Sequence, residues 1–467
     1  MLTKIANRIN YLKRLAWFVI LAGSAIAAAS PRQAVPQSAV PADRHRHVLV
    51  ISVDGMRPDS YTHPMPSSRI PNILRLKNEG SFATAVEGVY PTLTYPSHTT
   101  LVTGCLPAQH GIYTNLFSRE AGVNPGDWFW FAKSIRCKTL WDEARNHGMT
   151  TASVAWPVTA GAKIDWDVPE IWNPAEGLVA DPLYVAKFMD PVFGLQLLGA
   201  LGAPKPGLDS DVLRTRIAVY VIKTHRPDLL LVHLVDMDAT QHGFGPRTPQ
   251  AAAALSGIDA HIGEILSAVW QAGLGGNTDV FVVSDHGFLP VKEVIHPNIL
   301  LVKAGLLTVD AHGNISGGKI DTIANGGSFF IYWPPSLHLR AQVRQALEPL
   351  LQQQLAWAVL GPGAMKDLGA DPEVQLALDA PSGAMYDGSA SGQLVTAASG
   401  GDHGYLPFRH GLAASFIAWG PDIKAGVNLH RIRMVRIAPT ILKAMGVNDP
   451  SFGKTPPIED IWKNANH

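Results

Sequence analysis

Three aspartates stand directly after apolar runs of the sequence. Asp54 ends VLVISVD, Asp238 ends LLLVHLVDMD and Asp285 stands in VFVVSDH, with His242 and His286 close behind. Runs rich in Val, Ile and Leu are typical of strands buried in a parallel sheet, although short buried helices look alike. Because ligands of open α/β sheets bind beyond the carboxyl ends of the strands, we expect these side chains to converge there. Carboxylates beside imidazoles predict a metal-dependent active site, although any single Asp is also a common helix cap.

A candidate nucleophile lies in residues 89–112, VYPTLTYPSHTTLVTGCLPAQHGI. A short extended piece is predicted to run into a helix, with Pro96 in its first turn and Gly104 near its end. Thr94 then stands at the helix N-terminus, where unpaired N–H groups and the positive end of the dipole favour an anion. Its hydroxyl could act as a nucleophile on a phosphate group, and a simple N-cap is the alternative.

The first residues predict export. Four basic residues precede the apolar stretch LAWFVILAGSAIAAAS, whose last small residues resemble a signal-peptidase site, so residues 1–29 are interpreted as a signal peptide. Residues 30–46 are Pro-rich and suit a linker before a folded domain that begins at His47. We expect a periplasmic or secreted protein, with membrane contact only if the signal segment is not cleaved.

Composition narrows the class of protein. The chain has 467 residues, 46% of them hydrophobic and 16% charged, as in a globular enzyme of one large α/β domain. Its formal net charge is zero and becomes −4 once the signal peptide is removed, and it shows no basic stripe. A long nucleic acid is therefore not an expected partner. Cys105 and Cys137 form either a disulfide or two buried free thiols, and the sequence leaves both open.

A second structural unit is expected between His286 and His403. This stretch contains NILLVKAGLL, GSFFIYW and the helical pattern RAQVRQALEPLLQQQLAWAV, which is too long and too patterned for a loop. We predict a smaller subdomain or cap over about residues 290–400, inserted into a catalytic domain of residues 47–447. The chain returns to the main sheet through LAASFIAWG, and residues 448–467 form a C-terminal tail.

Five motifs, in order, cover nearly the whole folded domain: VLVISVDGMRPD, PTLTYPSHTTLVTG, VDMDATQHGFGP, VVSDHGF and GGDHGY. Together they resemble the nucleotide pyrophosphatase/phosphodiesterase branch of the alkaline phosphatase superfamily. The resemblance implies an α/β fold with a mostly parallel central sheet and helices on both faces. It also implies two Zn²⁺ ions per chain, with Mn²⁺ or Fe as alternatives. One ion would bind Asp238, His242 and His403, and the other Asp54, Asp285 and His286, with Thr94 bridging toward the substrate.

The same resemblance implies a reaction. Two metal ions about 4 Å apart can neutralise a phosphate group and activate a nucleophile. We expect Thr94 Oγ to attack phosphorus and water to hydrolyse the phosphothreonine. The Tyr95 N–H and the Ser97 hydroxyl are candidate donors to a phosphate oxygen, and the Tyr95 ring is expected either to stack on the substrate or to pack in the core. Ser97 stands where nucleotide-cleaving members carry Asn, which leaves nucleotide specificity open.

The predicted substrate is a small phosphate ester, such as a nucleotide. Residues 91–112 contain no Arg or Lys, whereas a doubly charged monoester usually needs a basic clamp, so a phosphodiester or pyrophosphate bond is favoured. A phosphomonoesterase, a phosphonate hydrolase and a metal-stabilised binding protein without catalysis are the alternatives. Two aspartates and four histidines are assigned no direct role in the reaction. Asp236 and Asp402 are interpreted as turn residues or partners of a ligand, and His98, His110, His233 and His296 as structural.

Overall fold

The computed structural model describes residues 46–117, 127–171, 182–202 and 210–463. The interpreted signal peptide and nearly all of the linker lie outside these residues. An eight-stranded sheet forms the main body, in the order β21-β2-β20-β9-β1-β8-β6-β7. Its strands are β1 (His47–Val53), β2 (Ser81–Phe82), β6 (Thr151–Val154), β7 (Trp166–Val168), β8 (Leu229–Leu234), β9 (Thr278–Val283), β20 (Phe416–Trp419) and β21 (Val427–Asn428).

The three apolar runs of the sequence form the middle of this sheet. β8 and β9 pair in parallel with the two edges of β1, and β6 and β7 continue in parallel beyond β8. β20 is antiparallel to β9, so the sheet is mixed but mostly parallel. Parallel strands with both faces covered carry apolar side chains toward both faces, which explains the absence of alternation in these runs.

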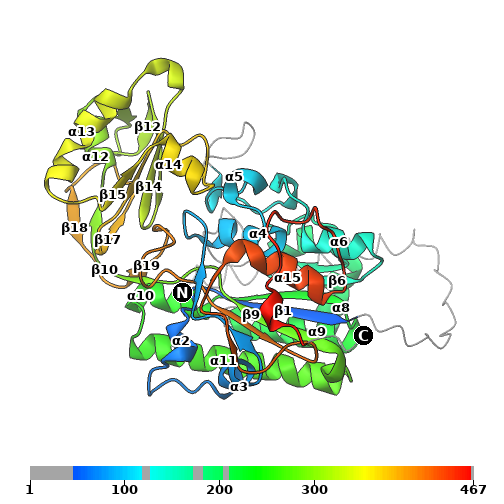
Figure 1. Cartoon of the computed structure of the whole chain (residues 1–467). Coiled ribbons are helices and arrows are strands. Elements are labelled where there is room, and N and C mark those ends of the chain that lie inside the picture. Colours follow the sequence, from blue (N-terminus) through cyan, green and yellow to red (C-terminus); the bar gives the residue numbers. More distant parts are fainter. Residues whose placement is uncertain (1–45, 118–126, 172–181, 203–209, 464–467) are drawn as a thin grey trace, which may run out of the picture. The chain divides into compact units, whose positions relative to one another are not determined.

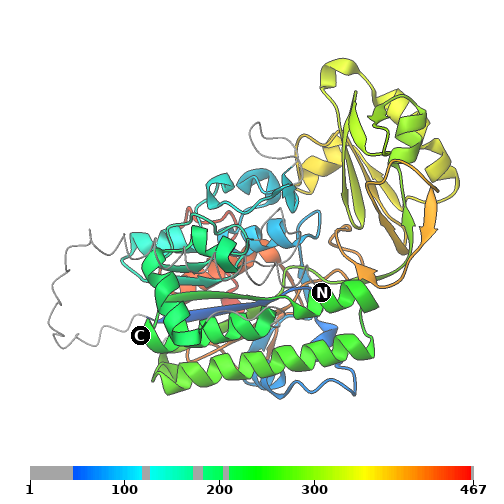
Figure 2. The ribbon, with the colours of Figure 1, turned by 180° about the vertical axis from the view of Figure 1, so that it is seen from behind.

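Helices cover both faces of the sheet (Figures 1 and 2). Val48 and Val50 of β1 face one core, and Leu49 and Ile51 face the other. The helices against the first core are α4 (Thr94–Thr103), α6 (Leu140–Asn146) and α15 (Ile437–Ala444). Those against the second are α3 (Pro71–Glu79), α9 (Ser210–Thr224) and α11 (Pro249–Gln271). By length and composition α11 could cross a membrane, but its buried side chains belong to this core.

The segment between the last two predicted ligand motifs has sheets and a core of its own (Figure 1). A four-stranded sheet consists of β13 (Asp321–Asn325), β14 (Ser328–Tyr332), β16 (Leu376–Asp379) and β15 (Ala358–Leu360). A second four-stranded sheet consists of β17 (Gly383–Tyr386), β10 (Leu289–Ile295), β18 (Val395–Ala397) and β19 (Gly401–Asp402). The adjoining helices are α12 (Asn298–Lys303) and α13 (Arg340–Gln352). We call this segment the cap. β10 begins it and β19 (Gly401–Asp402) ends it, and the two strands pair with each other.

Two expectations are resolved by the fold. Cys105 and Cys137 form a disulfide, with Cα atoms 6.8 Å apart, which ties the end of α4 to the segment before α6. The predicted domain boundary at residue 447 is too early. Phe452, Ile458 and Ile461 are buried in the same core as α15, so apolar residues of the supposed tail complete the main body.

Candidate active site with two metal-binding groups

Helix α4 places Thr94 at the site. Leu93 before it is extended, Pro96 lies in the first turn, and the helix ends at Gly104, whose φ of +67° suits a glycine. Thr94 is therefore the first residue of the helix, as the sequence predicts, and it is 8% exposed. The positive end of the helix dipole favours negative charge beside the hydroxyl.

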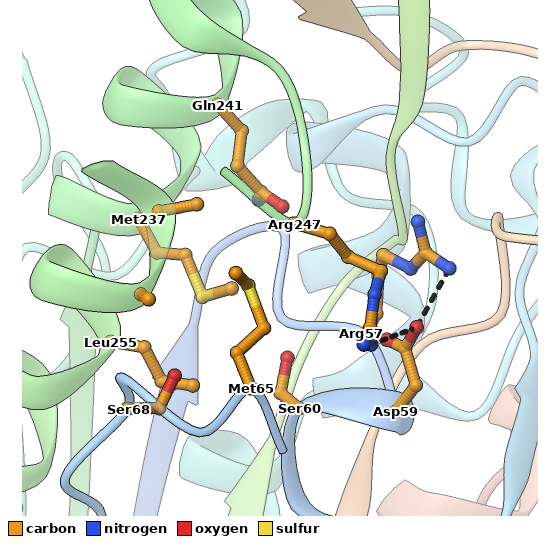
Figure 3. Close-up of a pocket in the computed structure, with 11 residues that line it drawn as sticks. Arg57, Asp59, Ser60, Met65, Ser68, Met237, Gln241, Arg247 and Leu255 are labelled. Carbon is orange, nitrogen blue, oxygen red and sulfur yellow. Dashed lines mark hydrogen bonds and ion pairs between the residues drawn. The ribbon is translucent and has the colours of Figure 1, made fainter. Parts of the chain in front are cut away.

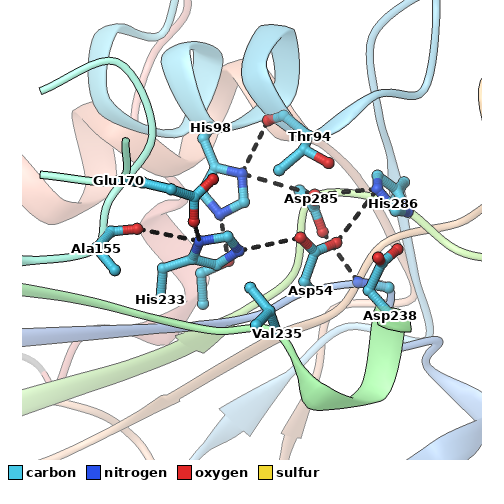
Figure 4. A network of polar contacts seen from close by, with 12 residues as sticks. Asp54, Thr94, His98, Ala155, Glu170, His233, Val235, Asp238, Asp285 and His286 are labelled. Atoms are coloured by element: carbon cyan, nitrogen blue, oxygen red, sulfur yellow. Dashed lines mark hydrogen bonds and ion pairs between the residues drawn. The ribbon is translucent and has the colours of Figure 1, made fainter. Parts of the chain in front are cut away.

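The first group of candidate metal ligands lies past the ends of β1 and β9 and consists of Asp54, Asp285 and His286 (Figure 4). His286 Nε2 lies 3.3 Å from Asp54 Oδ1 and 3.1 Å from Asp285 Oδ2. All three residues are buried. The structure thus brings together the three residues that the resemblance assigned to one zinc ion.

The second group consists of Asp238, His242 and His403. The first two lie one turn apart on α10 (Asp236–Phe244), and His242 Nε2 lies 3.5 Å from Asp238 Oδ2. His403 arrives from the end of the cap, and its Nε2 lies 3.2 Å from His242 Nε2 and 3.7 Å from Asp238 Oδ1. This is the other predicted set of ligands.

The donor atoms of these groups fit a cation. Within the described residues, four of them are buried without a hydrogen-bond partner: Asp54 Oδ1, Asp238 Oδ1, Asp285 Oδ2 and His286 Nε2. A buried polar atom without a partner costs about 1–3 kcal/mol, and one cation bound to each group would satisfy all four. Mixed oxygen and nitrogen donors, three per group, suit Zn²⁺ and leave a position for substrate.

Each of four candidate ligands also has a second polar atom, on the side away from its metal-facing atom, that contacts the backbone. Asp285 Oδ1 accepts a hydrogen bond of 3.1 Å from the N–H of Gly55. Gly55 has a φ of +69°, and a Cβ there would lie 3.0 Å from Gln241 and Phe288, so glycine is required. The three histidines each place Nδ1 against a carbonyl oxygen, which leaves Nε2 for a metal. The pairs are His403 with Thr92, His286 with Gly287 and His242 with Gly401.

Electrostatics point the same way. Burial raises the pKa of Asp54 and of Asp285 well above the ordinary value, and repulsion from other carboxylates adds to it. Burial lowers the pKa of His286 well below its ordinary value and that of His403 to about 3. Neutral imidazole is the form that binds a metal, and buried carboxylates beside it favour a cation.

A family model described as type I phosphodiesterase / nucleotide pyrophosphatase matches residues 48–401. The chain belongs to this family. Five of the six candidate metal ligands, and Thr94, lie within the matched residues. His403 lies two residues beyond them.

Relatives of this phosphodiesterase family member include longer proteins. Ectonucleotide pyrophosphatase/phosphodiesterase family member 1 of Mus musculus is 24% identical over 418 residues, which are 85% of this chain and 40% of that protein. The Homo sapiens protein of the same name is 24% identical over 436 residues, 89% of this chain and 42% of that protein. Venom phosphodiesterase of Macrovipera lebetinus is 26% identical over 255 residues, 51% of this chain and 25% of that protein. The chain spans less than half the length of these relatives.

Solved structures show the shared fold. Murine ectonucleotide pyrophosphatase/phosphodiesterase 5, solved as an inactive threonine-to-alanine variant in complex with AMP, has a TM-score of 0.66 and 19% identity, covering 90% of this chain and 100% of that chain. The human protein of that name has a TM-score of 0.63 and 18% identity, covering 87% and 97%. The predicted alkaline-phosphatase-like α/β fold is thereby confirmed.

The side chains of Tyr95 and Ser97, beside Thr94, are buried. The Tyr95 ring is wholly buried and lies edge-on to Trp128, with ring centroids 5.2 Å apart, so it presents no face to a substrate, as the core alternative expects. The Ser97 hydroxyl is also buried and has no partner among the described residues. The Tyr95 N–H donates to Asn115 Oδ1 at 2.9 Å, so it is already used within the protein. Asn115 was missed by the sequence analysis and reaches the first turn of α4 from a later loop.

Two histidines interpreted as structural touch the site. His98 Nδ1 lies 2.8 Å from Thr94 O and 3.6 Å from Asp285 Oδ2. His233 Nε2 lies 3.1 Å from Asp54 Oδ2 (Figure 4). A polar residue inside the apolar run LLLVHLV was the available signal for His233, because a buried polar side chain needs a partner.

The remaining candidates have local roles. Asp402 Oδ1 accepts from the N–H of His403 and lies 3.8 Å from His242 Nδ1, as expected of a partner to a ligand. Asp236 begins α10, and its N–H donates to Asp211. His110 Nε2 lies 3.1 Å from Thr100 Oγ1, and His296 contacts Asp387 and Thr396 within the cap.

A small pocket lies beside α10 (Figure 3). Its volume is about 20 Å³, which is room for roughly one water molecule. Arg57 and Arg247 both contact the Asp59 carboxylate, at 2.9 and 3.0 Å, which balances one of their two charges. This pocket is therefore too small for a phosphate ester.

Proposed function

We propose that the protein is an exported two-metal phosphodiesterase/nucleotide pyrophosphatase that hydrolyses phosphodiester or pyrophosphate bonds through a phosphothreonine on Thr94. The observation that carries this proposal is the convergence of partnerless buried donor atoms near the first residue of α4. A threonine there has a helix end for negative charge and metal ligands close by.

Zinc is the proposed ion at both groups, with Mn²⁺ or Fe as alternatives. Such ions supply positive charge to the phosphate oxygens and favour the ionised form of a hydroxyl. The residues that would hold them are Asp54, Asp285, His286 and Thr94 for one ion and Asp238, His242 and His403 for the other.

The residues of the chain suggest the order of bond changes. Oγ of Thr94 forms a bond to phosphorus while the bond to the leaving oxygen breaks, and the hydroxyl proton passes through solvent to the leaving oxygen. The leaving group departs with the electron pair. Water then attacks the phosphothreonine and restores the hydroxyl. Asn115 lies against the N–H of Tyr95, next to Thr94, and its amide nitrogen is a candidate donor to a phosphate oxygen.

The proposed substrate is a phosphodiester or pyrophosphate, such as a nucleotide. The absence of Arg and Lys from residues 91–112 supports a group of lower charge than a monoester. The AMP complex of the murine relative supports a nucleotide, and the loss of activity named for its threonine-to-alanine variant supports a threonine nucleophile. The buried Tyr95 ring argues against base stacking at that residue.

Export is supported by two observations. The disulfide between Cys105 and Cys137 suits an oxidising compartment such as the periplasm or the exterior. Relatives carry names that begin with "ecto" or denote venom enzymes. The proposed location is the periplasm or the medium.

The test is a paired assay of the purified protein with bis-p-nitrophenyl phosphate and p-nitrophenyl phosphate, with zinc or with a chelator. We expect zinc-dependent cleavage that favours the diester and disappears in Thr94→Ala. Thr99→Ala is the matched control, because this buried hydroxyl of the same helix only binds Tyr95 O. It should retain activity.

Other outcomes identify the alternatives. Preference for the monoester would indicate a phosphatase. Folded, zinc-loaded protein that turns over neither ester would leave a phosphonate hydrolase or a binding protein, and turnover of a phosphonate ester separates these two. Full activity of Thr94→Ala would contradict the phosphothreonine.

A further inference from the structure

A chain of buried polar contacts leads away from Asp54 (Figure 4). His233 lies in the middle of β8 and is 0% exposed. Its Nε2 lies 3.1 Å from Asp54 Oδ2, and its Nδ1 lies 2.9 Å from Glu170 Oε2. Arg214 of α9 donates to Glu170 Oε2 at 3.3 Å and to the His233 carbonyl oxygen at 3.0 Å. Four separate parts of the chain thus meet behind one carboxylate of the first metal-binding group.

We propose that His233 is a positioning residue for Asp54, held in place by Glu170 and Arg214. This rests on the proposed function, because the role of the contact is to present Asp54 to an ion. A carboxylate can bind a metal through either oxygen or both. Since Asp54 Oδ2 is engaged by His233, Oδ1 is the oxygen that faces His286, and this is the oxygen without a hydrogen-bond partner among the described residues.

The direction of the hydrogen bond follows from chemistry. An ionised carboxylate accepts only, so the nitrogen that faces Asp54 carries the hydrogen when Asp54 is ionised to hold a cation. The same holds for Nδ1 toward Glu170. Burial alone raises the pKa of Glu170, but His233 and Arg214 outweigh it and keep the pKa below the ordinary value, so Glu170 stays an acceptor. Arg214 thereby holds the carboxylate of Glu170, and Glu170 in turn holds the ring of His233.

The surroundings of His233 restrict its ring to one orientation. The His98 ring lies against it, with centroids 4.3 Å apart, and His98 is itself held between Thr94 O and Ser52 Oγ. The carbonyl oxygen of Ala155 also lies 3.1 Å from His233 Nδ1, and Ala155 has a φ of +54°, which is unusual for a residue with a side chain. A left-handed backbone at Ala155 turns a second acceptor toward the same nitrogen. Apolar packing would not require this arrangement.

The test uses two substitutions that differ in one contact. The amide nitrogen of glutamine takes roughly the place of imidazole Nε2, and that of asparagine takes the place of Nδ1. His233→Gln should therefore keep a donor to Asp54, whereas His233→Asn should keep only the contact to Glu170. Zinc affinity is measured by competition with a chromophoric chelator in full-length protein that also carries His242→Ala, so that the Asp54 group is the one measured.

We expect His233→Asn to weaken zinc binding about 10- to 100-fold, as loss of a contact to a ligand usually does, and His233→Gln to change it only a few-fold. Glu170→Gln, which keeps its shape and loses its charge, should fall between them. His296→Asn is the matched control, because His296 also pairs with a carboxylate, Asp387, but within the cap. It should leave zinc affinity unchanged.

Melting temperatures of the zinc-free variants separate positioning from folding. If the Asn and Gln variants melt alike without zinc and differ in affinity, the positioning role is supported. Equal zinc affinity in both would overturn it, whatever the melting temperatures. If both failed to fold, Glu170→Gln would decide, and wild-type affinity there would overturn the role. No zinc binding by the wild type would overturn the proposed function, and the role of His233 with it.

Discussion

His286 and His403 stack face to face, with ring centroids 3.7 Å apart and planes at 10°. They belong to different metal-binding groups and come from opposite ends of the cap. The two groups of ligands are therefore in contact through these rings, and a change at one ring alters the packing of the other.

The stack predicts that the two groups are not independent. In His403→Ala, bound zinc should fall from two ions per chain to one, and the remaining ion should bind more weakly than in the wild type, because His286 loses its neighbour. Metal analysis after dialysis at buffered free zinc gives both values.

His242→Ala supplies the comparison. His242 contacts His403 and Phe288, so its loss should remove the same ion and leave the Asp54 group at wild-type affinity. If the remaining ion binds equally well in both variants, the stack carries no coupling.

Asn115 predicts a defect in the reaction with little change in folding. Asn115→Ala removes both the acceptor for the Tyr95 N–H and the amide nitrogen, whereas Asn115→Asp keeps an acceptor and removes the nitrogen. If the nitrogen donates to the phosphate, both variants should lower kcat, by about 100-fold as for other lost donors of this kind. Steady-state kinetics with a diester and circular dichroism check this. A defect in the Ala variant alone would assign Asn115 to the helix end only.

The disulfide predicts a loss of stability when it is removed. The 32-residue separation of Cys105 and Cys137 corresponds to about 3–4 kcal/mol of unfolding free energy in the chain-entropy model. The double Cys→Ser variant should show this loss in urea denaturation of zinc-loaded protein, and reduced wild type should match it. An unchanged midpoint would contradict the expectation.

Asp167 on β7 predicts a pH-dependent stability. Burial raises its pKa from the ordinary 3.8 to about 8, although the hydroxyls of Ser153 and Thr159 oppose the rise. Between these two values the folded protein holds a proton that the unfolded chain has released, so stability is full below about pH 4 and is lost as the pH rises to 8. Asp167→Asn removes this loss.

The measurement is the difference in unfolding free energy between Asp167→Asn and wild type at several pH values. It should grow in favour of the variant from pH 5 to pH 8, by up to about 1.4 kcal/mol per unit. A difference that stays constant with pH would show that Asp167 does not titrate in this range.

The sequence predicts the parts of the site that are set locally. The start and the end of α4 follow from Pro96 and Gly104, and the places of Asp54 and Asp285 follow from the apolar strands before them. Contacts between segments far apart in the chain could not be predicted from such local patterns. Glu170 meets His233 only because β7 and β8 both flank β6, and Asn115 meets Tyr95 through a loop. Whether the Tyr95 ring faces solvent depends on Trp128, and whether Cys105 reaches Cys137 depends on the fold around both.

The pairing of β10 with β19 closes the cap at its base. Leu289 pairs with Asp402 and Pro290 with Gly401, so the segment leaves the main body and returns to it at one point, between His286 and His403. The cap also contacts this base through the turn after β13, where the N–H of Gly327 donates to the carbonyl oxygen of His403. The cap can therefore change, in evolution or by design, only where this turn keeps its place against His403.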